Sequence, residues 1–110
     1  MKGNVIVVKW WRGKRFAGVS IWPFIFVKHD KLTQQKRFIN HERIHLRQQL
    51  ELGILPFYLW YLLEYAIRLI QYQNFHLAYR NICFEREAYK NDRHLEYLKT
   101  RKTWAFFKYL

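Results

Sequence analysis

Apolar residues near the start of the chain gather in two short segments that have the character of β-strands. Residues 5–10 and 19–27 are rich in β-branched and aromatic side chains, and the stretch between them holds glycines and charges that favour a turn. Pro23 has no N–H to donate to a strand ladder, so an edge or a bulge is expected there. The pattern predicts a two-strand β-unit.

From Thr33 onwards the apolar positions follow a helical period. Thr33 is a candidate cap, and residues 34–52 contain neither Gly nor Pro. This first helix places one set of side chains on one side: Phe38, His41, Glu42, His45, Gln49 and Leu52. A second helix is predicted over residues 57–73. It is apolar nearly all round, so we expect it to be buried or to touch lipid, with Glu64 and Arg68 paired on its wet face.

The last third of the chain predicts further helices. Asn74 is a plausible cap for a helix that runs to about residue 91, and Asp92 for a final basic helix that ends in the aromatic residues 104–107. No repeat, linker or low-complexity tract divides the sequence. We therefore expect one α+β domain over residues 1–110, a small N-terminal β-unit followed by three to four helices.

The charge balance changes the picture of the surface. Twenty Lys and Arg against eight Asp and Glu give a net charge of +12, while 51% hydrophobic residues indicate a folded chain. The charge favours an anionic partner: an acidic polypeptide, nucleic acid or an anionic membrane face. Two basic clusters interleaved with aromatic residues suit nucleic acid, membrane or simple solvation: Lys9, Arg12, Lys14 and Arg15, and Lys99, Arg101, Lys102 and Lys108.

Cysteine usage and apolar run lengths bear on the compartment. Cys83 is the only cysteine, which excludes an intramolecular disulfide and an all-Cys metal site, and we expect it to be buried packing. The apolar run 5–8 is far shorter than a signal-peptide core. Residues 52–63 lack charges but number twelve, where a membrane span needs about 20. These features predict a cytoplasmic protein, with peripheral contact to an anionic membrane as a further expectation.

One five-residue pattern carries specific chemistry. The first predicted helix contains His41-Glu42-Arg43-Ile44-His45, which has the form HExxH. Histidines four residues apart lie one turn apart, so both imidazoles can reach one tetrahedral Zn²⁺, and Glu42 can act as general base toward a metal-bound water. Chance produces this pattern in such a chain about one time in a hundred. The alternative is a solvent-facing histidine pair.

A third ligand must come from elsewhere, because Gln48 and Glu51 stand where a metzincin continuation needs Gly and His. On the third predicted helix, Glu85 is followed three residues later by Ala88, and this resembles the ExxA element of gluzincin-type metallopeptidases. Over residues 33–100 the chain looks like small bacterial zincin-like proteins, and its apolar second helix is similar to the insertion of membrane-linked members. The resemblance implies that Glu85 completes the zinc site and that Ala88 lets the two helices approach. Glu87 is the alternative ligand.

Three further residues are weaker candidates for binding an oxyanion. Tyr89 lies one turn past Glu85 and has a hydroxyl to offer, although a tyrosine beside a small alanine is more often core. His76 and His94 are expected at the surface or at caps, with oxyanion binding as the alternative.

The most specific function that these patterns predict is zinc-dependent peptide hydrolysis. His41, His45 and Glu85 hold zinc, Glu42 is the base, and an edge strand within residues 19–27 pairs with an extended peptide. The alternative is a non-enzymatic basic module that binds an anionic membrane or nucleic acid, with zinc structural or absent.

Overall fold

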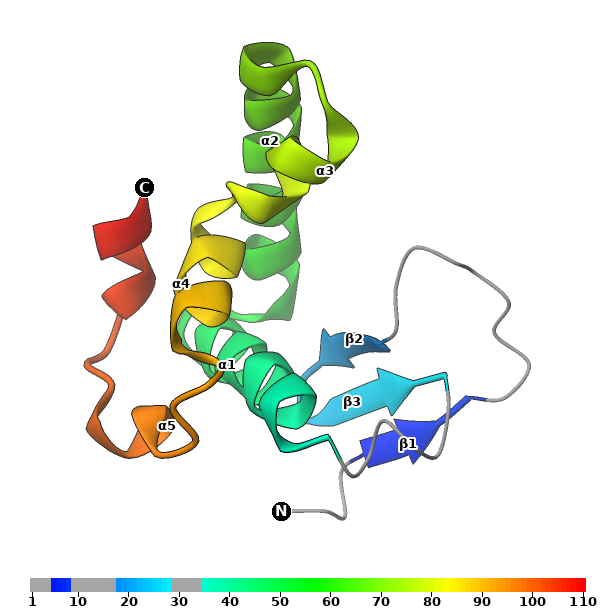
Figure 1. Ribbon diagram of the computed structural model, residues 1–110, viewed down its shortest axis with the longest axis vertical. Coiled ribbons are helices and arrows are strands. Elements are labelled where there is room, and N and C mark those ends of the chain that lie inside the picture. The colour runs from blue at the N-terminus through cyan, green and yellow to red at the C-terminus, as the bar shows by residue number, and fades with distance from the viewer. Residues whose placement is uncertain (1–4, 9–17, 29–34) are drawn as a thin grey trace.

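The computed structural model describes residues 5–8, 18–28 and 35–110, which form a small sheet followed by helices (Figure 1). This confirms the predicted α+β class with an N-terminal β-unit. Several expectations lie outside the described residues, namely the first basic cluster with Trp10 and Trp11, and the Thr33 cap.

The sheet has three strands in its described part, where the sequence predicted two. They are β1 (Val5–Val7), β2 (Gly18–Ile21) and β3 (Phe24–Val27), in the order β1-β3-β2. β3 is antiparallel to β2 and parallel to β1. The predicted single strand over residues 19–27 was wrong, because Trp22 and Pro23 form a turn that folds it into a hairpin. β2 therefore lies at an edge of the sheet.

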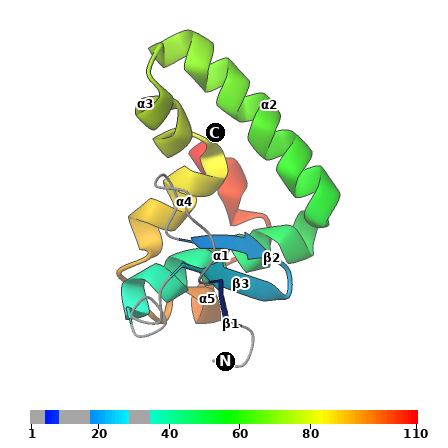
Figure 2. The same ribbon diagram turned by 90° about the vertical axis from the view of Figure 1, so that its right-hand side faces the viewer.

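The first two helices, α1 (Lys36–Leu52) and α2 (Ile54–Tyr72), meet at a sharp elbow. Gly53 lies between them with φ of 93°, a left-handed conformation that glycine adopts at little cost, and its N–H donates to the Gln49 carbonyl at 2.7 Å. The two helices are bent by 111°. As a result, α2 runs along the outside of the molecule and only its first turns approach the sheet (Figure 2).

The predicted third helix is two helices, α3 (Phe75–Arg80) and α4 (Cys83–Asn91). Asn74 caps α3 as expected, since its side chain accepts from the Leu77 N–H. Ile82 then has extended backbone angles, which end one helix and start the next. The predicted final basic helix is a short turn, α5 (Tyr97–Thr100), and a 3₁₀ helix, η3 (Ala105–Tyr109). Asp92 does not cap it.

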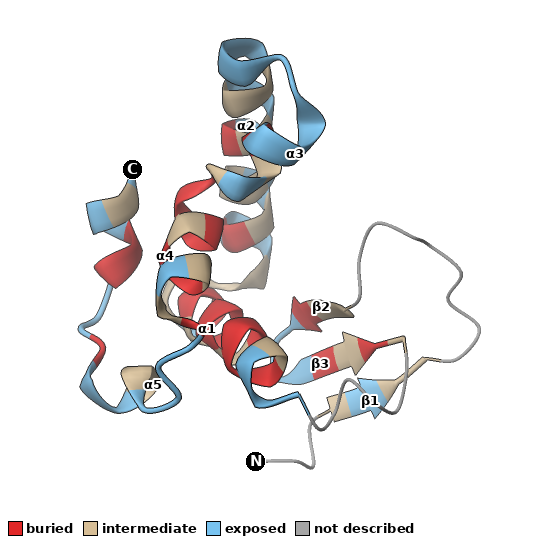
Figure 3. Cartoon of the chain, in the orientation of Figure 1, coloured by how far each residue is buried: buried red, intermediate tan, exposed pale blue. Residues whose placement is uncertain are grey.

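Two buried clusters lie on either side of α1. Ile25 and Val27 of β3 pack with Leu46 of α1. A larger cluster joins α2, α4 and η3 and contains Phe57, Ile82, Cys83, Phe84 and Phe106. The buried position of Cys83 is as predicted. Figure 3 shows buried residues concentrated along α1 and α4, so these are the central helices of the molecule.

The Glu64–Arg68 pair does not lie on a wet face, which corrects the sequence prediction. Glu64 is buried, and its carboxylate accepts from Trp60 Nε1 at 3.1 Å, from Arg68 Nη2 at 3.0 Å and from the Cys83 N–H at 2.9 Å. Ile82, at the N-cap of α4, has no side-chain acceptor to offer. The first N–H groups of a helix need an acceptor, and Glu64, a residue of α2, supplies one for the start of α4.

Arg101 was predicted to lie in an exposed basic cluster, and this was wrong. Its guanidinium is fully buried and makes paired contacts with Glu51, at 2.7 and 3.1 Å, and with Glu87, at 2.5 and 3.2 Å. Two buried carboxylates need a cation, and a guanidinium offers the forked donors that match them. Arg101 thus joins the C-terminal segment to α1 and α4.

Candidate metal centre

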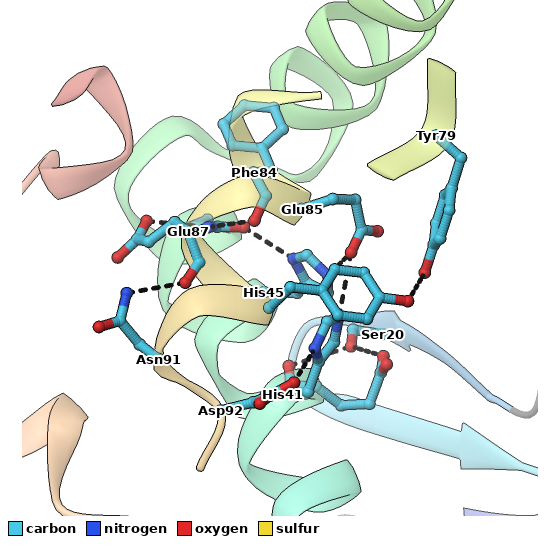
Figure 4. A network of polar contacts seen from close by, with 12 residues as sticks. Ser20, His41, His45, Tyr79, Phe84, Glu85, Glu87, Asn91 and Asp92 are labelled. Atoms are coloured by element: carbon cyan, nitrogen blue, oxygen red, sulfur yellow. Dashed lines mark hydrogen bonds and ion pairs between the residues drawn. The ribbon is translucent and has the colours of Figure 1, made fainter. Parts of the chain in front are cut away.

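His41 and His45 of α1 converge with Glu85 of α4 in the middle of the molecule (Figure 4). Oε1 of Glu85 lies 3.0 Å from Nε2 of His41 and 3.1 Å from Nε2 of His45. All three side chains are buried, and their candidate ligand atoms lie within 4.8 Å of one another. The i,i+4 spacing places both imidazoles on one side of α1, where they meet edge to face, and α4 packs on α1 with Ala88 fully buried. The three residues singled out from the sequence are therefore together.

A second set of residues fixes which nitrogen each histidine presents. Nδ1 of His41 lies 2.9 Å from Oδ2 of Asp92, an acceptor, so Nδ1 carries the proton and Nε2 keeps its lone pair in the neutral ring. Asp92 is itself held by Arg37 Nε, which donates to Oδ1 at 2.8 Å. Asp92, expected as a helix cap, thus orients His41.

Gln48 orients His45 as Asp92 orients His41. Its Nε2 donates to the Phe84 carbonyl at 3.2 Å and to Glu87 Oε1 at 3.0 Å, both of which can only accept. The amide oxygen of Gln48 must then face His45 Nδ1, 2.8 Å away, and His45 must donate from Nδ1. When the His45 ring is neutral, Nε2 is again the atom with the lone pair. Supporting acceptors of this kind are typical of metal-binding histidines.

The other oxygen of Glu85 is held from α2. The Tyr61 hydroxyl donates to Oε2 at 2.6 Å. Burial and the negative charge of Glu85 raise the pKa of Tyr61, so this hydroxyl stays a donor. Glu85 thereby keeps Oε1 directed at the two imidazoles.

Without a metal, the cluster is an ion pair. Burial alone would lower the pKa of His45, but the charge and hydrogen bond of Glu85, together with Glu42, outweigh it and raise the pKa to about 9. For Glu85, burial alone would raise the pKa, but the two histidines hold it well below its usual value. A proton on His45 therefore supplies the positive charge that a buried carboxylate requires.

The same atoms suit a metal ion. Ligand atoms 2.0–2.1 Å from a tetrahedral zinc lie about 3.3 Å apart, close to the 3.0 and 3.1 Å separations between the imidazole nitrogens and Glu85 Oε1. Imidazole nitrogen and carboxylate oxygen are both ligands that zinc and similar divalent ions accept. The His41–His45–Glu85 group could thus hold a metal ion in place of the His45 proton.

Glu42 lies beside this group in a pocket of about 260 Å³. Its Oε1 accepts from the Ser20 hydroxyl of β2 at 2.5 Å, and the same hydroxyl lies 3.0 Å from the Glu42 carbonyl. The edge strand β2 therefore positions this carboxylate. The pocket is lined by Gly18, Val19, Ser20, Glu42, His45, Gln49, Phe57, Tyr58, Tyr61, Tyr79 and Glu85.

The structure places the remaining candidates around the centre. Glu87, the alternative ligand, is bound by Gln48, Arg101 and Tyr97 and is not part of the metal-binding group. Tyr89 packs its ring edge-on against His41, and its hydroxyl lies 2.7 Å from that of Tyr79. Of these two tyrosines, Tyr79 lines the pocket that holds Glu42.

A larger cavity, of about 540 Å³, has Tyr89 in its lining and includes none of His41, His45 and Glu85. It is lined by His76, Leu77, Arg80, Asn81, Arg86, Tyr89, Lys90 and Tyr109. His76 thus faces this cavity. His94 does not line either cavity, and its backbone carbonyl accepts from Asn40.

Comparisons with protein-family models, with curated proteins and with solved structures found no match. Within the described ranges, no single helix is long and apolar enough to cross a membrane, although α1 and α2 together reach that length and composition across their 111° bend. The function is therefore inferred from the geometry of the centre and of the surface.

Sequence reasoning missed four residues of the centre. Gln48 stands three residues after His45 on the same helix, so its contact could have been found from the helical period. Asp92, Tyr61 and Ser20 come from three other segments, and only the tertiary fold brings them to the site. No local pattern marks them.

Proposed function

We propose that this protein is a zinc-dependent metallopeptidase with a minimal zincin-like site. The observation that carries the proposal is the convergence of two oriented imidazole Nε2 atoms and one carboxylate beside a second carboxylate, Glu42, that lines the same pocket as His45 and Glu85. A pair of histidines alone would support metal binding only. The additional carboxylate supports hydrolysis.

The number of ligands favours a catalytic role for the metal. Structural zinc sites close the coordination sphere with four protein ligands, whereas catalytic ones use three. The group in the described part of the chain has three members, His41, His45 and Glu85. When bound, zinc supplies a Lewis acid that polarises a carbonyl and lowers the pKa of water to about 7.

The residues of the pocket divide the remaining work. Glu42 Oε1, held by Ser20, accepts the proton of the attacking water and returns it to the leaving amine. Tyr79 is the closer candidate than Tyr89 for donating to the oxyanion, because it lines the pocket. Burial and the charge of Glu85 raise the pKa of Tyr79, so its hydroxyl remains protonated. Tyr89 then serves as the hydrogen-bond partner of Tyr79.

The substrate class that fits this pocket is an extended peptide. Three of its lining residues, Gly18, Val19 and Ser20, belong to the edge strand β2, and a peptide can add to an edge strand through main-chain hydrogen bonds. The Ser20 carbonyl already accepts from Gln49 Nε2 at 2.8 Å and from the Tyr58 hydroxyl. The peptide would therefore pair with the part of β2 before Ser20, at Gly18 and Val19, because the Ser20 carbonyl is already occupied.

Zinc content and peptide cleavage test the proposal. The protein, stripped with a chelator and reloaded, should hold one zinc per chain by elemental analysis, and His45→Ala should lose it on dialysis. Glu42→Gln should keep the zinc but cleave a mixed peptide library at least about 100-fold more slowly. Glu96→Gln, a matched change at an exposed carboxylate, should behave like the original protein.

Two results would overturn the proposal. One is cleavage by Glu42→Gln at the original rate. The other is a fully zinc-loaded protein that cleaves no member of the library, which would favour the non-enzymatic alternative, a basic module with structural zinc.

A further inference from the structure

The outward side of α2 is a continuous row of bare aliphatic side chains. We call it the α2 outer face; it consists of Leu55, Leu59, Leu62, Leu63, Ile67 and Ile70. Each is more than half exposed, up to 76% for Leu55 and 77% for Ile70. Successive members are separated by three or four residues, or by one between Leu62 and Leu63, so all six lie on one side of the helix over about 23 Å. Figure 2 shows that this helix forms the margin of the molecule.

The charged residues of α2 face the inside of the molecule, which is the reverse of what is expected of a helix in water. A surface helix normally buries its apolar stripe and exposes its charged residues. The only two charged residues of α2, Glu64 and Arg68, pair with each other, and Glu64 is buried against α4. The outer face therefore has no charge to keep it hydrated, and a single helix with so much exposed apolar surface marks an interaction site.

The rest of the described surface indicates what the partner is. Of the seven acidic residues in this part of the chain, only Glu96 is exposed; five are buried, and Glu51 is half-buried with its side chain 8% exposed. The exposed charged side chains of the described residues are therefore mostly basic, in a chain whose net charge is +12. Two such chains repel each other, which disfavours a second copy on the outer face, whereas an anionic surface attracts them.

We propose that the α2 outer face docks this protein onto an anionic lipid bilayer. The aliphatic row enters the boundary between headgroups and acyl chains with the helix axis along the surface, and the exposed Lys and Arg side chains contact the headgroups. α2 cannot leave the fold to cross the bilayer without losing its contacts with Glu85 and α4. Nucleic acid would satisfy the charge but would leave the aliphatic row in water.

Sedimentation with vesicles tests this proposal independently of any activity. At low salt the protein should bind vesicles of phosphatidylcholine with phosphatidylserine, and bind vesicles of phosphatidylcholine alone at least tenfold more weakly. Raising the salt should weaken binding, because the electrostatic contribution is screened.

A pair of variants separates the aliphatic row from charge alone. The double variant Leu59→Glu/Leu63→Glu should lose more than tenfold in partitioning. Leu95→Glu/Leu110→Glu makes the same change of charge at two exposed leucines elsewhere and should lose much less. Circular dichroism and zinc content confirm that both variants are folded.

Three results would overturn the proposal. They are no binding to anionic vesicles at low salt, equal losses in the two double variants, and a lipid-free dimer in sedimentation equilibrium that Leu59→Glu/Leu63→Glu dissociates. The last result would show that a second copy covers the face.

Discussion

At the scale of single residues, the centre is organised around one carboxylate. Glu85 contacts three side chains on two helices: its Oε1 lies beside the Nε2 atoms of His41 and His45, and its Oε2 accepts from the Tyr61 hydroxyl. Glu87, two residues further on, faces a different set that includes Arg101. Because α4 turns these two glutamates to different sides, one chain segment serves both the candidate metal centre and an internal ion pair.

This division leads to a prediction about the third ligand. Glu85→Gln should weaken zinc binding by more than about 100-fold, since a ligand charge is lost. Glu87→Gln should change zinc affinity by much less but should lower the free energy of unfolding, because Arg101 loses part of its counter-charge. Competition with a chelating dye and urea unfolding measure the two effects. A larger loss of zinc affinity at Glu87 would contradict the assignment.

His45 leads to a prediction about pH. Its pKa of about 9 in the folded, metal-free protein lies above the ordinary value of 6.5. Protonated His45 therefore contributes stability that is fully present below pH 6.5 and is lost as the pH rises through 9. The contribution is on the order of 3 kcal/mol.

Urea unfolding in the presence of a chelator should show this loss between pH 6.5 and 9.5. The zinc-loaded protein is the control, because there His45 is a neutral ligand at every pH in that range. A metal-free protein whose stability is flat across the range would show that His45 is not protonated.

At the scale of elements, α2 is attached to α4 through a buried carboxylate. Glu64 accepts from the first N–H of α4 and from Arg68. Glu64→Ala should lower the free energy of unfolding by about 3 kcal/mol, because it leaves the Arg68 charge and the Cys83 N–H without this acceptor. Gln71→Ala removes another partner of Arg68 at an exposed position and should cost less than about 0.5 kcal/mol. Similar costs for both variants would argue against a structural role for Glu64.

The helices also show which parts of the fold can be predicted from the sequence. The long period of residues 36–52 predicts α1 and the facing of His41 and His45, since both follow from 3.6 residues per turn. The break between α3 and α4 at Ile82 cannot be predicted from the sequence, because neither Gly nor Pro marks it. The burial of Glu64 is equally unpredictable from the sequence. An i,i+4 ion pair is usually solvated, and Glu64 is buried only because α4 packs against it.

At the scale of the whole molecule, Arg101 joins the C-terminal segment to the two helices that carry the centre. Arg101→Met should cost several kcal/mol, on the order of 3–5, at pH 7, because Glu51 and Glu87 remain buried without a cation. Lys102→Met, at an exposed neighbour, should have little effect on unfolding. The deficit should shrink on acidification to about pH 5, where buried carboxylates without a counter-charge take up protons. A deficit that does not depend on pH would point to lost packing as the cause.

The contact between the Tyr61 hydroxyl and Glu85 links one side of α2 to the buried centre. Tyr61 belongs to the helix whose other side carries the aliphatic row, and its hydroxyl holds the oxygen of a metal ligand. If docking on a bilayer shifted this helix, the affinity for zinc would change. By thermodynamic reciprocity, zinc would then change the affinity for the bilayer by the same factor. In this fold, an exposed aliphatic surface and a buried polar centre are separated by the width of a single helix.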